Sequence, residues 1–384
     1  MAQVINTNVA SLNAQRNLST SNSQLATSLQ RLSSGLRINS AKDDAAGLAI
    51  SERFTAQIRG VDQAARNAND GISLAQTAEG ALTEVGNNLQ RIRELAVQSS
   101  NGTNSQSDRD ALQAEVGQLL SEIDRVANQS SFNGVKLLDG SGGSFVFQVG
   151  ANAGETITVA NILDTNIAVL GGTTSIDTAQ SGSIATTITD TTAAAAGSLT
   201  INGIDMGAFS AVGTSSQRAA QVVEAINNNS AQTTVSASLN TTTGKIELVS
   251  AGTITVGGTD NGAKTGFDGV TGLTSTSNSQ TGLSALSVSG FSGAQLAIGQ
   301  IDAALTQVNS ARGGLGAVQN RFTSVVSSLS SASENLTASR SRIRDADFAK
   351  ETAELSRNQI LQQAGTAMLA QANQLSQGVL QLLR

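Results

Sequence analysis

The sequence contains no proline, cysteine, histidine, tryptophan or tyrosine, so its few aromatic residues are all phenylalanine. The absence of histidine excludes a Ser-His-Asp or Cys-His catalytic group and an imidazole general base. The joint absence of cysteine and histidine excludes the usual zinc, haem, iron–sulfur and copper sites. No D-x-[DN]-x-[DN]-G calcium loop occurs either. We therefore expect a protein that is not an enzyme and that binds no metal or cofactor.

Charged residues make up only 14% of the chain, with 23 basic and 29 acidic side chains and a net charge of −6. This balance gives no electrostatic reason to bind nucleic acid or an anionic membrane. No apolar run reaches the length of about 18 residues that a membrane span needs. The first residues lack a basic segment followed by an apolar one, so we expect no cleaved secretory signal peptide.

Charge divides the chain into two ends and a middle. Residues 151–285 hold only three basic side chains, Arg218, Lys245 and Lys264, and are rich in threonine, glycine and serine. The two ends are richer in charge and carry the periodic apolar positions of helices. This organisation predicts an α+β protein in which long coiled-coil helices from both chain ends pair and enclose a β-rich insert. Such a protein is structural and self-associating.

The strongest periodicity lies in the C-terminal third of the chain. Apolar residues recur there at every seventh position, as in the core of a coiled coil. These rod-core positions are Ile301, Val308, Leu315, Phe322, Leu329, Leu336 and Ile343. A helix over about 294–344 would be roughly 75 Å long. A single proline would kink it, which gives the absence of proline a mechanical meaning.

Apolar stripes also run towards both chain ends. Isolated helices are marginal in water, so these ends need a partner, and the opposite end of the same chain is the first candidate. The stripe residues are Leu25, Leu29, Leu32 and Leu36 near the N-terminus, and Leu361, Met368, Leu375, Val379 and Leu382 near the C-terminus.

The middle of the chain has the alternating pattern of strands. Alternation over 145–149 and 156–159 predicts a β-hairpin near 144–160. Residues 199–249 predict a ββαββ module with one short helix. The adjacent acids Asp43 and Asp44 stand at a helix start, where we interpret them as capping residues rather than a catalytic pair.

Several segments of the two ends carry the signatures of a known family. At the N-terminal end these are Leu29–Phe54 and Asn69–Leu82; at the C-terminal end they are Leu315–Phe322, Ser341–Phe348 and Ile360–Asn373. They resemble bacterial flagellin, the subunit of the flagellar filament, over about 1–160 and 290–384. The Leu199–Gly207 unit resembles a short module of flagellin inserts.

The resemblance implies three domains. Residues 1–42 and 345–384 would form an inner terminal helical domain. Residues 43–175 and 286–344 would form a helical rod domain of the outer tube, and 176–285 a variable, surface-exposed β-rich insert. The implied function is polymerisation into the helical filament that serves as a motility propeller. Subunits of this family are exported unfolded, without a cleaved N-terminal signal peptide, and add at the distal tip outside the cell.

The resemblance also implies partners. These are further copies of the chain, an export chaperone on the C-terminal helix, and the filament cap and hook–filament junction proteins. A host flagellin-sensing Toll-like receptor is a further expected partner. By motif match its contacts would be Arg91, Leu95 and Glu115, although the same face is also expected to serve subunit packing.

Three alternatives stay open on the sequence. The first is a hook–filament junction protein, which shares weaker versions of both end signatures. The second is a non-flagellar secreted coiled-coil adhesin, which would leave the missing signal peptide unexplained. A carboxylate-based glycosidase is disfavoured because the insert is poor in acids and has no aromatic platform for a sugar.

Overall fold

In the computed structural model, the described residues are 7–160, 162–180, 188–240, 244–260, 262–267 and 276–382. The chain divides into two compact units. The first consists of Met1–Asn69, Gln148–Thr156 and Thr323–Arg384, and the second of Asp70–Phe147 and Ile157–Phe322. Two long helices contribute residues to both units, so the architecture is α+β with the helices built from both chain ends, as the sequence predicts.

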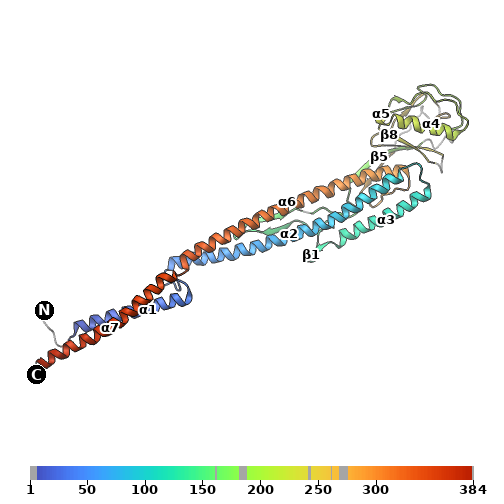
Figure 1. The fold of residues 1–384 in the computed structure, drawn as a ribbon. Coiled ribbons are helices and arrows are strands. Elements are labelled where there is room, and N and C mark those ends of the chain that lie inside the picture. Colours follow the sequence, from blue (N-terminus) through green and yellow to red (C-terminus); the bar gives the residue numbers. More distant parts are fainter. Residues whose placement is uncertain are drawn as a thin grey trace. The chain divides into compact units, whose positions relative to one another are not determined.

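Five long helices form the frame of the fold (Figure 1). They are α1 (Val9–Ser34), α2 (Ala45–Ser99), α3 (Gln106–Gln129), α6 (Phe291–Arg344) and α7 (Phe348–Leu382). The predicted helix at 294–344 is therefore confirmed as α6, which has 54 residues. None of the described helices is both long enough and apolar enough to cross a membrane.

Local capping signals fix where these helices begin and end. The side chain of Asn8 accepts a hydrogen bond from Ser11 N at the start of α1, and Gly35 ends that helix with φ +71°. Asp44 accepts from Gly47 N at 2.8 Å, so the capping interpretation of this acid is confirmed. Ser105 and Asp108 form a reciprocal capping box at the start of α3.

The core of the second unit follows the seven-residue repeat. Of the predicted rod-core residues, Ile301, Val308 and Phe322 are fully buried, and Leu315 is 5% exposed. The remaining three belong to the first unit, where Leu329, Leu336 and Ile343 are half-buried. Helix α2 has a matching repeat, whose buried members are Val61 and Ala68 in the first unit and Ala75, Leu82, Leu89 and Ala96 in the second.

Short strands follow α3. Strands β1 (Ser131–Phe132) and β2 (Val135–Lys136) flank an Asn-Gly turn, and β3 (Phe145–Gln148) pairs with β4 (Thr156–Val159) where alternation predicts a hairpin. From β3, the ring of Phe147 contacts the buried ring of Phe322 edge to face, with centroids 5.5 Å apart.

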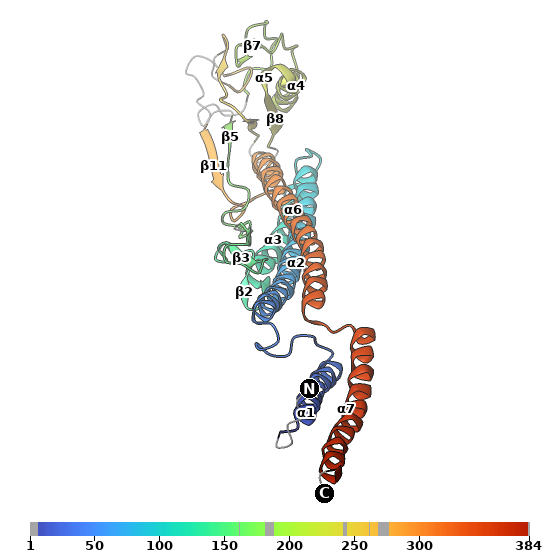
Figure 2. The same ribbon diagram turned by 90° about the vertical axis from the view of Figure 1, so that its left-hand side faces the viewer.

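In the first unit, α1 and α7 run side by side, as the views in Figure 1 and Figure 2 agree. The segment that follows α1 and the segment that precedes α7 are joined by backbone hydrogen bonds. Arg37 N donates to Arg344 O at 2.7 Å, and Ala346 N donates to Gly35 O at 2.9 Å. The two sequence-distant ends of the chain are thus tied together where each terminal helix meets its neighbour.

The insert contains two small antiparallel sheets and one amphipathic helix. The larger sheet has the order β11-β5-β9-β8, and the smaller one β10-β6-β7. The strands are β5 (Thr173–Gln180), β6 (Thr200–Ile201), β7 (Ile204–Asp205), β8 (Val235–Leu239), β9 (Ile246–Ser250), β10 (Val256–Gly257) and β11 (Thr276–Thr281). Helices α4 (Ser215–Asn228) and α5 (Ser230–Thr233) connect β7 to β8.

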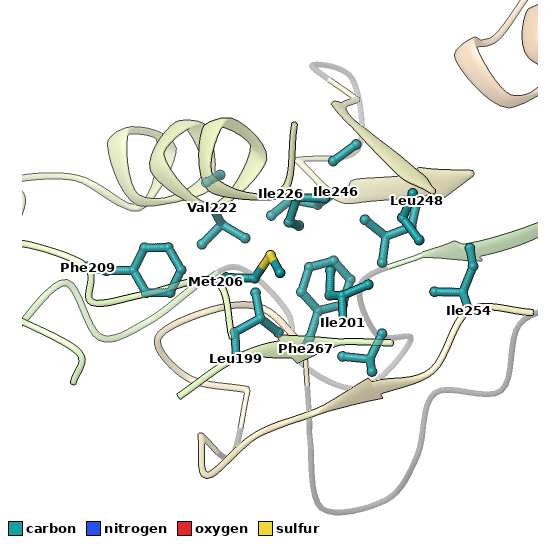
Figure 3. Close-up of a cluster of buried hydrophobic side chains, with 14 of the residues drawn as sticks. Leu199, Ile201, Met206, Phe209, Val222, Ile226, Ile246, Leu248, Ile254 and Phe267 are labelled. Carbon is teal, nitrogen blue, oxygen red and sulfur yellow. The ribbon is translucent and has the colours of Figure 1, made fainter. Parts of the chain in front are cut away.

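A core of its own holds the insert together (Figure 3). The side chains of Val222 and Ile226 from α4 belong to the same buried cluster as Ile201 and Leu248 of the two sheets and Leu199, which precedes β6. The elements β6, β7, α4, β8 and β9 follow the predicted ββαββ order. Strands β5 and β11 come from threonine- and serine-rich flanks, where apolar alternation predicts no strand.

Candidate self-association surface

The seam between α1 and α7 combines half-buried leucines, among them Leu18, Leu25 and Leu369, with small and polar residues. Only Ser28, Glu351 and Asn358 are less than 9% exposed on the described side chains of these two helices. A methyl group on Gly365 of α7 would lie 3.3 Å from Leu18 Cδ1, which shows how closely the helices approach. Most of the described side chains of α1 and α7 thus stay at least partly open to solvent.

Polar contacts fix the register of this pair. Asn8 Nδ2 donates to Ala372 O at 2.9 Å, and Ser11 Oγ donates to Asn373 Oδ1 at 2.9 Å. At the other end of the seam, Arg31 and Glu351 are 3.9 Å apart. Polar groups in a helical seam specify register at a cost in stability.

Several large apolar side chains of the same two helices are exposed. Their exposed fractions lie between 45% and 65%, although such residues are usually buried in folded chains. They are Val9, Leu12 and Leu29 on α1, and Phe348, Ile360, Leu361 and Met368 on α7. We call these seven residues the terminal apolar surface. These side chains are available to pack against another protein surface.

The predicted stripe residues divide between the seam and the terminal apolar surface. Leu25, Leu32 and Leu36 are half-buried, whereas Leu29, Leu361 and Met368 are exposed. Leu375, Val379 and Leu382 lie within α7, but their side chains are outside the described part of the structure. Over the described side chains, the exposed Leu361 and Met368 are therefore not the main contact with α1, which includes Glu351, Gly365 and Ala372.

Sequence reasoning overlooked Glu351, Asn358 and Gly365 because they are polar or small. Their spacing of seven residues was the available signal, since it repeats like a coiled-coil position. A search restricted to apolar residues finds the predicted stripe and misses these three residues.

A second exposed feature lies on α2 and α3 of the second unit. Arg91 forms ion pairs with Glu115 at 2.8 Å and with Glu94 at 2.9 Å. Hydrogen bonds to Glu94 and Glu115 raise the pKa of the Arg91 guanidinium. About half of the Arg91 and Glu115 side-chain surfaces is open to solvent. The structure thus brings together two of the three predicted receptor contacts.

Leu95 does not share this exposure. It is 1% exposed and lies on the same helix face as the fully buried Ile92 and Ser99. The spacing of three and four residues places all three towards the rod core. The expectation that Leu95 offers its side chain to a partner is therefore corrected for the folded monomer. The exposed apolar residue nearby in sequence is Val97, with 49% of its surface accessible.

The described residues contain no group of three or more acidic side chains that could hold a metal ion. The chemistry that the structure does offer is apolar association and exposed ion pairing. Apolar contacts and ion pairs both occur at protein–protein interfaces.

Comparison with known proteins identifies the chain's relatives. Residues 5–142 match the bacterial flagellin N-terminal helical region, residues 298–383 match the bacterial flagellin C-terminal helical region, and residues 198–252 match the flagellin hook IN motif. Flagellin B of Vibrio cholerae is 44% identical over 391 aligned residues, and a flagellin of Salmonella rubislaw is 40% identical over 496. Both alignments cover all of this chain and all of the relative.

A solved structure of FliC from Burkholderia pseudomallei is 26% identical to this chain, with a TM-score of 0.37. It covers 65% of this chain and 99% of its own. The family itself rests on the two full-length relatives and on the matches at both chain ends: this chain belongs to the bacterial flagellin family.

Proposed function

We propose that this chain is the structural subunit of a flagellar filament and that copies polymerise through the terminal apolar surface. The observation that carries the proposal is the exposure of seven large apolar side chains on α1 and α7, between 45% and 65% each. Roughly half of the surface of each of these side chains stays open in the described part of the chain, and a second copy would supply a surface of the same chemistry.

The energetics favour assembly through many weak contacts acting together. Full burial of a Leu, Ile, Phe or Met side chain contributes about 1.5–3 kcal/mol. Ordering the backbone costs about 1–2 kcal/mol for each residue that was mobile before assembly. One contact therefore cannot hold a terminal helix in place, whereas several contacts on both helices can. Loss of either terminal helix should stop polymerisation.

We propose that this chain has the three regions that its membership of the flagellin family implies. Residues 1–42 and 345–384 would form the inner terminal domain, 43–175 and 286–344 the rod domain, and 176–285 the outer insert. The backbone bonds between Arg37 and Arg344 support a boundary near these positions. The separate core of the insert supports its treatment as a module.

The route outside the cell is part of the proposal. The subunit would leave unfolded through the flagellar export apparatus, without cleavage of a signal peptide, and join the filament under its cap. Before export, the exposed apolar residues of α7 would need cover, which supports an export chaperone on that helix. The junction protein between hook and filament would be a further neighbour.

A host flagellin-sensing Toll-like receptor is the proposed partner of the exposed Arg91–Glu115 pair. Exposed charges of opposite sign at a fixed spacing favour a specific partner through electrostatic complementarity. Val97, one turn along α2 from Glu94, adds an exposed apolar side chain. Leu95 would act indirectly, by packing the helix that presents Arg91.

Seeded elongation tests the filament function directly. Purified chain is added to short filament seeds, and growth is followed by light scattering and electron microscopy. We expect long filaments from the unmodified chain and from Met368→Leu, and no growth from Met368→Asp, because a carboxylate resists burial. A junction protein of the same family would add to seeds without forming long filaments, and that result would replace the proposal.

A further inference from the structure

The larger sheet of the insert ends at β8, and the structure shows how this edge is closed. In the order β11-β5-β9-β8, strand β8 pairs on one side with β9, and no other described strand pairs with it. The edge of a sheet presents unpaired N–H and C=O groups, which can pair with a strand of another chain. The backbone of Ala237 lies in the middle of β8 and points these groups outward.

Asn227, in the last turn of α4, occupies that edge with its side chain. Its Oδ1 accepts a hydrogen bond from Ala237 N at 2.8 Å, and its Nδ2 donates to Ala237 O at 2.9 Å. A carboxamide has one acceptor and one donor side by side, so it offers Ala237 the same pair of bonds as a neighbouring strand. One side chain thus takes the place of a strand at the centre of the edge.

Other groups cover the start of the edge. Val235 N donates to the hydroxyl of Thr233 at 3.3 Å, so the first outward N–H is also occupied. The edge strand itself carries no charged residue and no proline, which are the usual means of keeping edges apart. The protection of β8 therefore depends on side chains from outside the strand, and Asn227 provides two of the bonds.

We propose that Asn227 blocks strand pairing between the inserts of two copies of this chain, so that copies associate through other surfaces only. The composition of β8 explains why such a block is needed. β8 is a short sequence of valine, serine, alanine and leucine, and an open edge of this kind pairs readily with a second strand. This inference does not depend on filament formation, because it concerns pairs of free chains.

The chain offers a matched control at the same helix end. Asn229 lies two residues further along, and its Nδ2 donates to Ala225 O at 2.9 Å, away from β8. Asn229→Ala therefore removes one amide hydrogen bond at the end of α4 without opening the edge. Asn227→Ala removes two and leaves both groups of Ala237 free.

The experiment measures self-association of the full-length chain without seeds, by sedimentation velocity over a range of concentrations. Two backbone hydrogen bonds regained between copies would strengthen association by about tenfold or more. We expect this increase for Asn227→Ala and none for Asn229→Ala. Adding Ala237→Pro to Asn227→Ala should abolish the increase, because proline removes the edge N–H.

A cross-linking measurement locates the contact. The chain has no cysteine, so Ser238→Cys places a single thiol on β8. A flexible bis-maleimide should link two copies in the Asn227→Ala background and not in the Asn229→Ala or unmodified background. If Asn227→Ala lowers the unfolding temperature but raises neither association nor cross-linking, the proposal is overturned and the amide is only a structural bond.

Discussion

Gly71 and Phe322 approach so closely that a methyl group on Gly71 would lie 2.6 Å from Cζ of the phenylalanine ring. The ring is fully buried and contacts Phe147 edge to face. It has no open space into which to move, so only glycine fits beside it. The close packing of α2 against α6 in the second unit depends on this absence of a side chain.

Gly71→Ala should therefore destabilise the monomer despite alanine's higher helix propensity. Overpacking a well-packed core costs about 1–3 kcal/mol. Gly80→Ala on the same helix is the matched control, because no atom lies within 4 Å of the added methyl group. That change should raise the free energy of unfolding by up to about 1 kcal/mol. Denaturant unfolding measures both.

The same site provides a double-mutant test. Phe322→Leu removes the ring, so Gly71→Ala should cost less in this background than in the unmodified chain. Equal costs in the two backgrounds would show that the ring is not what excludes a side chain at position 71.

Removing either charge of the Arg91–Glu115 pair should affect recognition by the proposed receptor more than it affects the stability of the protein. Arg91→Ala and Glu115→Ala remove an exposed ion pair, which contributes at most about 1 kcal/mol. Both should lower signalling by the proposed receptor in a reporter-cell assay. Arg125→Ala is the control, since Arg125 forms a similarly exposed ion pair with Glu122 on α3. Full signalling by folded Arg91→Ala protein would contradict the proposed contact.

Leu95→Asp should also lose receptor signalling, but because the protein no longer folds stably. The carboxylate would enter the rod core, where burial of an unpaired charge is strongly unfavourable. We expect loss of cooperative unfolding together with loss of signalling. Circular dichroism and thermal unfolding separate this outcome from a lost contact. A stably folded Leu95→Asp protein would show that the side chain is more accessible than its 1% exposure indicates.

The part of the fold that could be predicted is the part that repeats. Ile301, Val308 and Phe322 recur at every seventh residue, and all are buried. The direction in which a residue faces was harder to predict where two helix faces are both partly apolar. Leu95 and the α7 stripe show this, because periodicity identifies a face but not what covers it. Asn227 could not be identified either, since its role depends on a strand ten residues away.

Low pH should destabilise the N-terminal capping box of α3. Hydrogen bonds from the Ser105 side chain and backbone lower the pKa of Asp108 below its ordinary value of 3.8. A lowered pKa in the folded state means that the ionised carboxylate stabilises the fold above the ordinary pKa. This contribution is lost as the pH falls through the folded-state pKa.

Ser105→Ala removes the hydroxyl donor of this capping box. The unfolding temperature of the variant should then fall less between about pH 5 and pH 2 than that of the unmodified chain, because less of the pKa shift remains to be lost. Ser121→Ala on the same helix is the control, because its hydroxyl bonds a backbone carbonyl and no carboxylate. Identical pH profiles for all three proteins would contradict this role of Ser105.

Hydrogen exchange of α1 and α7, compared between the dilute monomer and the polymer, tests polymerisation through the terminal helices most directly. Because few described side chains of these two helices are fully buried, we expect fast exchange over Val9–Ser34 and Phe348–Leu382 in the monomer. In the polymer, the same amides should become strongly protected. Full protection of both helices in the dilute monomer, or a polymer that leaves them unprotected, would contradict assembly through this surface.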